Sequence, residues 1–379
     1  MKPAVAILGG GMITHDQLLP SLYQLQRIGV IGEILVNARH ADKLDALAAS
    51  ETIRAAFPTS SFHRVVGDYS EALKLLPPRS IAIIALPDQL HYASVLAALA
   101  ADQHVCVVKP LVLRASESVE IEHASKARNL FVGIEYHKRF DDRSLLARRR
   151  YREGRFGEFK LGTARLMEKW SYRYSNFQNW CTVENSDAFT YIGCHYVDLV
   201  AFITGLTPTA VSVYGIRDRF PNGNEGFLWT DARVIYSNGA ALNVQNSLSF
   251  PDEAPGPNTQ GITMYCSGSD GGAWLDHSDQ YRGLKYSLLG GPYTEPSPDY
   301  FTYVEYGGAG LKPMGYGYRS VEAIVAACVN VENGSMTLDE IDAAGLIATP
   351  ANSRYNEHLI EAARRSILND GRLETVGTA

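Results

Sequence analysis

The first third of the chain alternates short apolar runs with helical patterns. The apolar runs have the length of strands and include residues 4–8, 33–37, 63–66, 81–86 and 105–108, and the helical patterns between them include 41–56 and 91–101. Nearly continuous apolar strands separated by helices are typical of a parallel sheet that is buried on both faces. We therefore predict an α/β fold whose N-terminal part is an open, doubly wound parallel sheet.

The second half of the chain has strand-like segments that are separated by Gly, Pro and Asn turns. These segments are 160–167, 210–216, 232–236, 241–248 and 262–267, and a helical pattern over 356–369 follows near the C-terminus. Turn residues between β-rich segments favour strands of a second sheet.

One helical pattern in this half, from Tyr191 to Ile203, carries polar groups that can do chemistry. At about 100° per residue, Ile192, Tyr196, Leu199 and Ile203 form an apolar stripe, and Tyr191, His195, Asp198 and Phe202 lie together on a neighbouring side. A phenol, an imidazole and a carboxylate therefore share one side of a helix. From this stretch alone, a buried histidine and tyrosine with ordinary hydrogen bonds is the simpler interpretation.

The turn after the first apolar run indicates a dinucleotide site. It reads Gly9-Gly10-Gly11-Met12-Ile13-Thr14, which is G-x-G-x-x-T, so Thr14 replaces the third glycine of the fingerprint. The first two glycines permit a tight turn and a close approach of the backbone to a pyrophosphate, and the helix N-terminus favours the anion. Pro87 and Lys109 also follow apolar runs. Because ligands bind at the carboxyl ends of parallel strands, we expect these residues to converge there.

The residues after the second strand bear on the choice between NAD and NADP. An NAD site usually has Asp or Glu here, whereas this chain has Asn37-Ala38-Arg39-His40, with no acid before Asp42. A guanidinium suits a 2′-phosphate through paired, charge-assisted bonds, so we favour NADP over NAD. Arg39 could equally stack on the adenine without selecting between the two cofactors.

Composition narrows the class of protein. The chain has 379 residues, of which 46% are hydrophobic, so two domains are expected. A net charge of −6, with one basic run at 148–150, argues against nucleic acid as the main ligand. Five scattered cysteines fit a reducing compartment, and no His, Asp, Glu or Cys set has the spacing of a metal site. The absence of a membrane-length apolar segment and of a signal-like start predicts a cytoplasmic protein.

Several motifs in order along nearly the whole chain resemble the glucose–fructose oxidoreductase / inositol dehydrogenase / MocA family. They are the glycine turn at 7–11, Ala85-Leu86-Pro87-Asp88-Gln89-Leu90-His91, the segment 104–111 ending in Lys109-Pro110-Leu111, the segments 133–140 and 154–158, and the helix with His195. The resemblance implies a dinucleotide-binding Rossmann domain over 1–135. It also implies a second α/β domain over 136–379, with a large open, mostly antiparallel sheet that binds substrate and forms a homo-oligomer, a dimer or tetramer.

The family chemistry is hydride transfer between nicotinamide and a carbohydrate or polyol carbon. The resemblance and the residues together make His195 the general base or acid and Lys109 the group that stabilises the alkoxide. Two positions depart from the family: Val108 replaces the Glu of E-K-P, and Tyr191 replaces the Asp of D-x-G-x-x-H. We expect Tyr191 to complete the catalytic set and Asp198 to compensate in part, although an ordinary helix-network role for Asp198 fits equally well.

The remaining site predictions concern binding. The cofactor is expected at Gly9, Gly11, Met12, Ile13, Asn37, Arg39, Leu86, Pro87, His91 and Lys109. The substrate is expected at Lys109, His137, Trp170, Tyr172, Tyr191, His195 and Asp198, since aromatic faces pack on sugar rings. An interface or core role for these aromatic side chains is the alternative. Two other functions stay open: a glycosidase that uses NAD for transient oxidation and elimination, and a non-catalytic regulator that senses a sugar or nucleotide.

Overall fold

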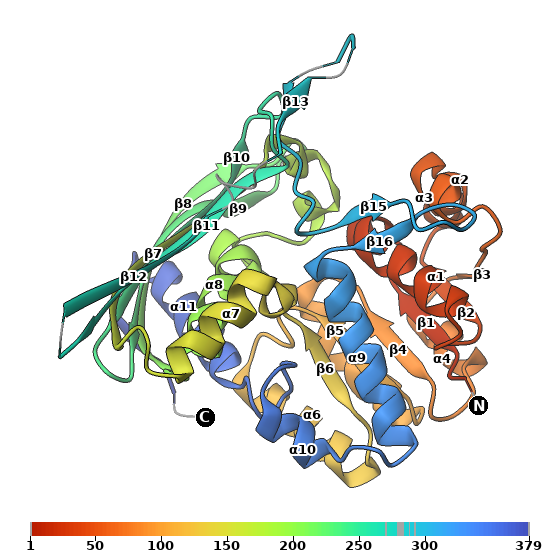
Figure 1. Ribbon diagram of the computed structural model, residues 1–379, viewed down its shortest axis with the longest axis horizontal. Coiled ribbons are helices and arrows are strands. Elements are labelled where there is room, and N and C mark those ends of the chain that lie inside the picture. The colour runs from red at the N-terminus through yellow and green to blue at the C-terminus, as the bar shows by residue number, and fades with distance from the viewer. Residues whose placement is uncertain (1, 270, 279–283, 288, 292, 378–379) are drawn as a thin grey trace. The chain divides into compact units, whose positions relative to one another are not determined.

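The chain forms two compact units. The computed structural model describes residues 2–269, 271–278, 284–287, 289–291 and 293–377 (Figure 1). The first unit contains residues 1–112, 116–140 and 299–353, and the second contains 113–115, 141–298 and 354–379. The sequence analysis placed one domain boundary at 135/136. In the structure the chain also returns to the first unit over residues 299–353, which that boundary did not include. That return adds a buried helix to the first core, through Val321, Ile324 and Val325.

Six parallel strands in the order β3-β2-β1-β4-β5-β6 form the sheet of the first unit. Their bounds are β1 Val5–Leu8, β2 Ile34–Ala38, β3 His63–Val66, β4 Ile81–Ile84, β5 His104–Val108 and β6 Val132–Glu135. Every residue of β1, β2, β4 and β6 is buried, as expected for mostly apolar strands of a parallel sheet, and this includes the polar Asn37 and Glu135. The strand order reverses beside β1, where a doubly wound sheet binds its ligand, and the prediction of this sheet is confirmed.

Helices cover the sheet of the first unit, and α9 runs alongside β5 and β6 (Figure 1). They are α1 Leu19–Arg27, α2 Ala41–Ala49, α3 Glu51–Ala56, α4 Tyr69–Leu75, α5 His91–Ala100, α6 Ala115–Arg128, α9 Tyr316–Glu332 and α10 Leu338–Ala344. A two-stranded piece, β15 Thr302–Val304 and β16 Lys312–Met314, precedes α9. The single helix expected over 41–56 is wrong, because Ser50 caps α3 by accepting a bond from the Ile53 N–H.

The second unit is built on a seven-stranded sheet in the order β12-β11-β7-β10-β9-β8-β17. Its strands are β7 Glu158–Lys169, β8 Pro208–Arg219, β9 Glu225–Tyr236, β10 Ala241–Phe250, β11 Asn258–Gly268, β12 Gly271–Ser278 and β17 Glu374–Thr375. Only β7 and β10 pair in parallel, so the predicted mostly antiparallel sheet is confirmed. The short strands β13 Tyr286–Ser287 and β14 Tyr293–Thr294 form a separate pair.

Three helices cover one face of this second sheet: α7 Asp142–Arg152, α8 Cys194–Thr204 and α11 Tyr355–Leu368 (Figure 1). The apolar side chains of the strands that point to this face form the core of the unit. Every residue from Cys194 to Ile203 is buried, because α7 and α11 also contact α8. The prediction that only one side of this helix faces a core is therefore wrong, because α8 is buried on all sides. None of the helices in the described ranges is long and apolar enough to cross a lipid bilayer.

Candidate active site

The glycine turn after β1 has the geometry of a dinucleotide cradle. Gly9 has φ +121°, and a Cβ there would lie 2.1 Å from the Ala85 carbonyl oxygen. The Thr14 hydroxyl donates to the Gly9 carbonyl oxygen at 2.5 Å, which closes the turn. A Cβ on Gly11 would meet no heavy atom within 4 Å, so the backbone there is open to a ligand. The helical residues 12–13 lead into a π-helical segment, Thr14–Leu18, which precedes α1.

The end of β2 presents one exposed cation. Asn37 is buried, and its amide donates to the carbonyl oxygens of Val65 (3.1 Å) and Gly67 (3.2 Å), so its side chain shapes the turn after β3. Arg39 is exposed. Hydrogen bonds from Ser70 lower the pKa of Asp68, and the nearby Arg39 charge adds to the effect. The guanidinium expected to bind a 2′-phosphate is thus accessible and has a carboxylate neighbour.

The turns after β4 and β5 are held together by His91. Its buried ring places Nε2 2.8 Å from the Leu86 carbonyl oxygen and Nδ1 2.7 Å from the Pro110 carbonyl oxygen. These contacts fix the Leu86–Pro87 turn beside the cis Lys109–Pro110 peptide. Lys109 itself is 8% exposed and directly follows β5. His91 therefore supports the edge at which cofactor binding is predicted.

A polar cluster lies at the end of β6. His137 Nδ1 is 3.0 Å from Glu135 Oε2, and the imidazole ring stacks on Tyr316 with 5.5 Å between centroids. Gln17, from the π-helical segment, donates to Glu135 Oε1 at 2.7 Å. The sequence predicted His137 but missed Glu135, Gln17 and Tyr316. A carboxylate ending a buried strand was the available signal for Glu135, whereas no local pattern indicates that Gln17 and Tyr316 join it.

In the second unit, a π-helical segment, Phe189–Gly193, leads into α8 and carries Tyr191. A Cβ on Gly193 would lie 2.6 Å from both Asn246 Oδ1 and the Phe189 ring, so only glycine lets the helix begin this close to β10. His195 is 5% exposed, and Tyr191 is half-buried. Tyr191 and His195 lie on either side of Gly193, where the helix comes close to β10.

Asp198 is directed toward α11. It accepts hydrogen bonds from the Tyr355 hydroxyl at 3.0 Å and from the Asn356 amide at 2.9 Å, and it is 1% exposed. These bonds join α8 to α11 inside the second unit. The helix-network role that the sequence left open for Asp198 is therefore filled, and substrate binding by this carboxylate stays only a prediction.

Tyr191 belongs to an aromatic cluster that includes one other predicted substrate residue. Its ring meets Phe177 edge to face, with centroids 4.4 Å apart, and Trp180 at 5.5 Å. Tyr172 packs on the same Phe177 at 5.7 Å. Phe177 and Trp180 are buried, while Tyr172 and Tyr191 keep some exposed surface. The structure thus brings two of the predicted substrate residues together around a rigid aromatic base.

Trp170 belongs to another group of side chains. The Arg173 guanidinium stacks 3.8 Å from the Trp170 ring centroid and donates to Asp218 at 2.7 Å. Trp229 donates to the same carboxylate at 3.2 Å. Asp218 belongs to β8 and Trp229 to β9. Through Arg173, Trp170 is therefore connected to these two strands and not to the aromatic cluster around Tyr191. Its predicted role in substrate binding has no support from these contacts.

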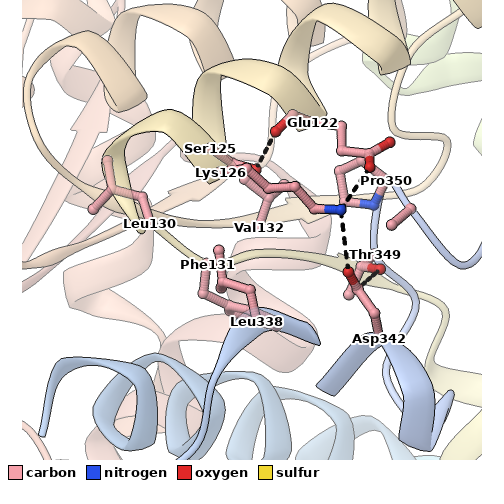
Figure 2. A pocket seen from close by; sticks show the side chains of 11 residues that line it. Glu122, Ser125, Lys126, Leu130, Phe131, Val132, Leu338, Asp342, Thr349 and Pro350 are labelled. Atoms are coloured by element: carbon pink, nitrogen blue, oxygen red, sulfur yellow. Dashed lines mark hydrogen bonds and ion pairs between the residues drawn. The ribbon is translucent and has the colours of Figure 1, made fainter. Parts of the chain in front are cut away.

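A small cavity of about 20 Å³ lies at the opposite end of β6 from Glu135 (Figure 2). Thr349 donates to Asp342 there, and Lys126 lies 4.0 Å from the same carboxylate. Burial raises the pKa of Asp342. The volume is that of about one water molecule, far below what a dinucleotide or sugar requires. Within the described ranges, no group of three or more His, Cys, Asp or Glu residues could hold a metal ion.

Comparison with known families identifies both halves of the chain. Residues 4–136 match the model of the Gfo/Idh/MocA oxidoreductase family with its NAD-binding Rossmann fold. Residues 144–273 match the Gfo/Idh/MocA C-terminal domain.

Individual curated relatives match only part of the chain and at low sequence identity. An uncharacterized oxidoreductase of Schizosaccharomyces pombe is 30% identical over 171 residues, which are 44% of each chain. Levoglucosan dehydrogenase of Pseudarthrobacter phenanthrenivorans is 25% identical over 206 residues, 53% of this chain and 51% of the relative. The chain thus spans about half the length of the curated relatives it matches.

A solved structure agrees with the fold over the full length. Myo-inositol 2-dehydrogenase from Lactobacillus plantarum matches with a TM-score of 0.69 and 15% identity, covering 100% of both chains. At this identity the likeness concerns the fold alone. With family models matching both halves of the chain, the protein belongs to the Gfo/Idh/MocA oxidoreductase family.

Proposed function

We propose that this protein is an NAD(P)-dependent oxidoreductase that transfers a hydride between nicotinamide and a hydroxyl-bearing carbon of a sugar, inositol or glycoside. The observation that carries the proposal is the turn after β1, in a chain of this oxidoreductase family. Gly9 is forced to be glycine by its φ and by the Ala85 carbonyl, and Gly11 is open. This is the shape that a pyrophosphate requires at a helix N-terminus.

The residues of the first unit fit a nicotinamide dinucleotide. Gly9 and Gly11, with Met12 and Ile13 at the start of the helix, would hold the pyrophosphate, and Leu86 and Pro87 would border it. The dinucleotide, when bound, supplies the acceptor or donor of hydride. Asn37 and His91 are assigned supporting roles, because their side chains bind the backbone of neighbouring turns.

Arg39 favours NADP within this proposal. It is exposed at the end of β2, where the ribose is expected, and a guanidinium binds a phosphate through two parallel bonds. The Asp68 carboxylate nearby would orient this side chain. NAD remains the other cofactor to be tested.

His195 is assigned the role of base in oxidation and acid in reduction. A secondary alcohol must release its proton as hydride leaves, and a neutral imidazole takes that proton at neutral pH. Lys109 is assigned the role of stabilising the developing alkoxide through a hydrogen bond. Tyr191 lies one turn before His195 and would bind or orient the substrate through its hydroxyl.

The aromatic cluster supports a ring-shaped substrate. Tyr172 and Tyr191 are partly exposed above the buried Phe177 and Trp180, so they offer rigid apolar surface. Apolar faces of sugar and inositol rings pack on such surfaces, while phenol groups bond to hydroxyls. A substrate-binding role is also proposed for His137.

The uncovered face of the second sheet supports a homo-oligomer. In register across five strands lie Trp274, Tyr265, Leu161, Ala241 and Ile235, an apolar row whose three largest members are more than half exposed. Charged positions of both signs, Arg165, Arg233, Asp231 and Asp276, line a hollow beside it. A surface with an apolar row and mixed charges can complement a second copy of itself.

The cytoplasm is the proposed location, since all five cysteines are free and buried.

The test is a panel of sugars, inositols and glycosides assayed with NAD and with NADP. A stoichiometric rise in nicotinamide absorbance with a free polyol or sugar supports the proposal. Glycoside cleavage without net change in nicotinamide would favour the NAD-dependent glycosidase instead. Binding of ligand without turnover under any condition would favour a sensing role.

A further inference from the structure

Glu135 is a buried carboxylate with an unusually complete set of hydrogen-bond donors. It ends β6 and is 2% exposed. Its Oε1 accepts from the Gln17 amide at 2.7 Å and from the Ser320 hydroxyl at 2.5 Å. Its Oε2 lies 3.0 Å from His137 Nδ1. A buried charge needs such partners, and three different segments of the first unit supply them.

The contact with Glu135 determines where His137 carries its proton. An ionised carboxylate only accepts hydrogen bonds, so Nδ1 of His137 must be the donor. In the neutral ring, Nε2 is then the unprotonated nitrogen and a hydrogen-bond acceptor. Gln17 and Ser320 hold the carboxylate from its other oxygen, so it cannot easily turn away from the imidazole.

Aromatic contacts fix the plane of the same imidazole. Tyr316 stacks on it at 28° with centroids 5.5 Å apart, and Tyr300 lies at 5.3 Å with a 52° tilt. The Tyr300 hydroxyl donates to Gln17 Oε1 at 2.7 Å, which leaves the Gln17 amide nitrogen to face Glu135. Both the protonation site and the orientation of His137 are therefore set before any ligand binds.

The location gives this arrangement a functional meaning. Val108 of β5 pairs with Glu135 of β6, so Lys109 and the residues after Glu135 emerge from neighbouring strands at the carboxyl edge. That edge is where an open α/β sheet binds its ligands. His137 is 14% exposed, which leaves part of its ring accessible.

We propose that Glu135 is a positioning residue that keeps His137 in the Nδ1–H form, so that His137 Nε2 accepts a hydrogen bond from a hydroxyl of an uncharged polyol. This inference rests on the proposed function and names its substrate class. An acceptor nitrogen backed by a carboxylate favours a hydroxyl donor and disfavours a substrate carboxylate. The arrangement thus selects neutral polyols and sugars against sugar acids.

The first experiment reads the protonation site without relying on turnover. Nitrogen-15 NMR of the full chain, labelled at its ten histidines, separates protonated from unprotonated ring nitrogens, and the spectrum of His137→Gln assigns the signal. We expect Nδ1–H and an unprotonated Nε2 in the wild type. In Glu135→Gln the amide group can face the ring as a donor, so we expect a shift to the Nε2–H form. Addition of a polyol with cofactor should move the Nε2 resonance in the wild type only.

The second experiment measures specificity. Glu135→Gln should raise KM for the polyol about tenfold, the equivalent of one good hydrogen bond, while KM for the cofactor stays unchanged. The ratio of kcat/KM for a polyol over the corresponding sugar acid should fall by a similar factor. Glu120→Gln, the same substitution at an exposed carboxylate, is the matched control and should leave both KM values and the specificity ratio unchanged.

Different results separate this inference from the proposed function. A wild-type His137 protonated at Nε2, or one that does not respond to polyol, overturns the inference even if the enzyme is active. An unchanged tautomer and specificity in a folded Glu135→Gln variant does the same. Failure of every sugar and polyol in the assay panel overturns the proposed function, whatever the tautomer. Thermal unfolding of each variant shows whether a loss comes from unfolding.

Discussion

Thr14 is the residue at which the nucleotide turn departs from the usual three glycines. Its side chain is fully buried and bonds back to Gly9, and the helix widens into a π-helical segment from this residue onward. The second π-helical segment precedes His195. Such segments occur frequently at functional sites, because the extra residue in a turn redirects side chains. In this chain, Gln17 and Tyr191 are the side chains redirected.

The roles proposed for His195 and for Lys109 are tested separately by His195→Gln and Lys109→Met. We expect kcat to fall by about 10²–10⁴-fold in each, which is the usual contribution of a general base or of an oxyanion-stabilising group. Both variants should still bind the cofactor, as followed by the fluorescence of the reduced nicotinamide. His123→Gln and Lys74→Met alter exposed residues of the same types and should keep full activity. Near-normal kcat in either site variant would remove that residue from the mechanism.

Arg39 makes a prediction about cofactor choice. Arg39→Ala should raise KM for NADP by about tenfold or more, since charge-assisted bonds to a phosphate are lost. KM for NAD should change by less than about threefold, because NAD lacks the 2′-phosphate. Arg155→Ala, another exposed arginine, controls for the loss of general positive charge. Equal effects on both cofactors would mean that Arg39 only stacks on the adenine.

At the scale of elements, the sequence pattern located β1 to β5 of the first sheet and the greater part of β7, β8, β10 and β11 of the second. It did not predict β6, β12 or β17, and it covered only the last five residues of β9. The fully buried strands β1 and β4 carry continuous apolar sequence, so their limits follow from composition, whereas β2 and β6 each contain a buried polar residue, Asn37 and Glu135. The break between α2 and α3 was missed because Ser50 acts through its cap bond, which leaves no gap in the helical pattern. The sequence analysis also did not predict that the segment 299–315 belongs to the first unit, for another reason. Its Tyr, Gly and Pro residues have no periodicity, and they are ordered by contacts with distant residues such as Gln17 and Ala56.

His104, the first residue of β5, gives a prediction about how the free energy of unfolding depends on pH. Burial lowers the pKa of His104, although Glu332 3.3 Å away acts in the opposite direction. Below about pH 6.5 the unfolded chain binds a proton at this histidine that the folded chain does not bind. The free energy of unfolding therefore falls as the pH decreases from that value toward the lower pKa of the folded state.

His104→Gln removes this titration, so urea unfolding between about pH 7 and 5 should show a smaller loss of stability than in the wild type. At pH 7 the variant should already be less stable by about 1–3 kcal/mol, because the Phe131 N–H bonds to His104 Nδ1 at 3.0 Å. His123→Gln, on an exposed histidine, should keep the wild-type pH dependence. Parallel pH curves for wild type and His104→Gln would contradict the assignment.

At the scale of the whole chain, sequence order and spatial grouping differ. The candidate cofactor residues come from four strand ends, and parallel topology alone predicted that they share an edge. The register of the second sheet does not follow from topology in this way. Four strand pairings are needed to bring five residues into one row, namely Trp274, Tyr265, Leu161, Ala241 and Ile235. No local pattern relates these positions, so the sequence could not predict the row. An oligomer was expected from the family resemblance. The row identifies the residues that would form its interface.

That row gives a prediction about assembly. Leu161→Glu and Tyr265→Glu each place a charge within the apolar row, where it would lose its hydration in an interface without an opposite charge as partner. We expect the wild type to sediment as a dimer or larger species at micromolar concentration and both variants to shift toward the monomer. Leu75→Glu, at an exposed leucine of α4 with similar exposure to Leu161, should leave the mass unchanged. A wild type that is monomeric across the concentration range would contradict the proposal, and so would variants that retain the wild-type mass. Circular dichroism distinguishes dissociation from unfolding, since these side chains point away from the core and their substitution should leave each unit folded.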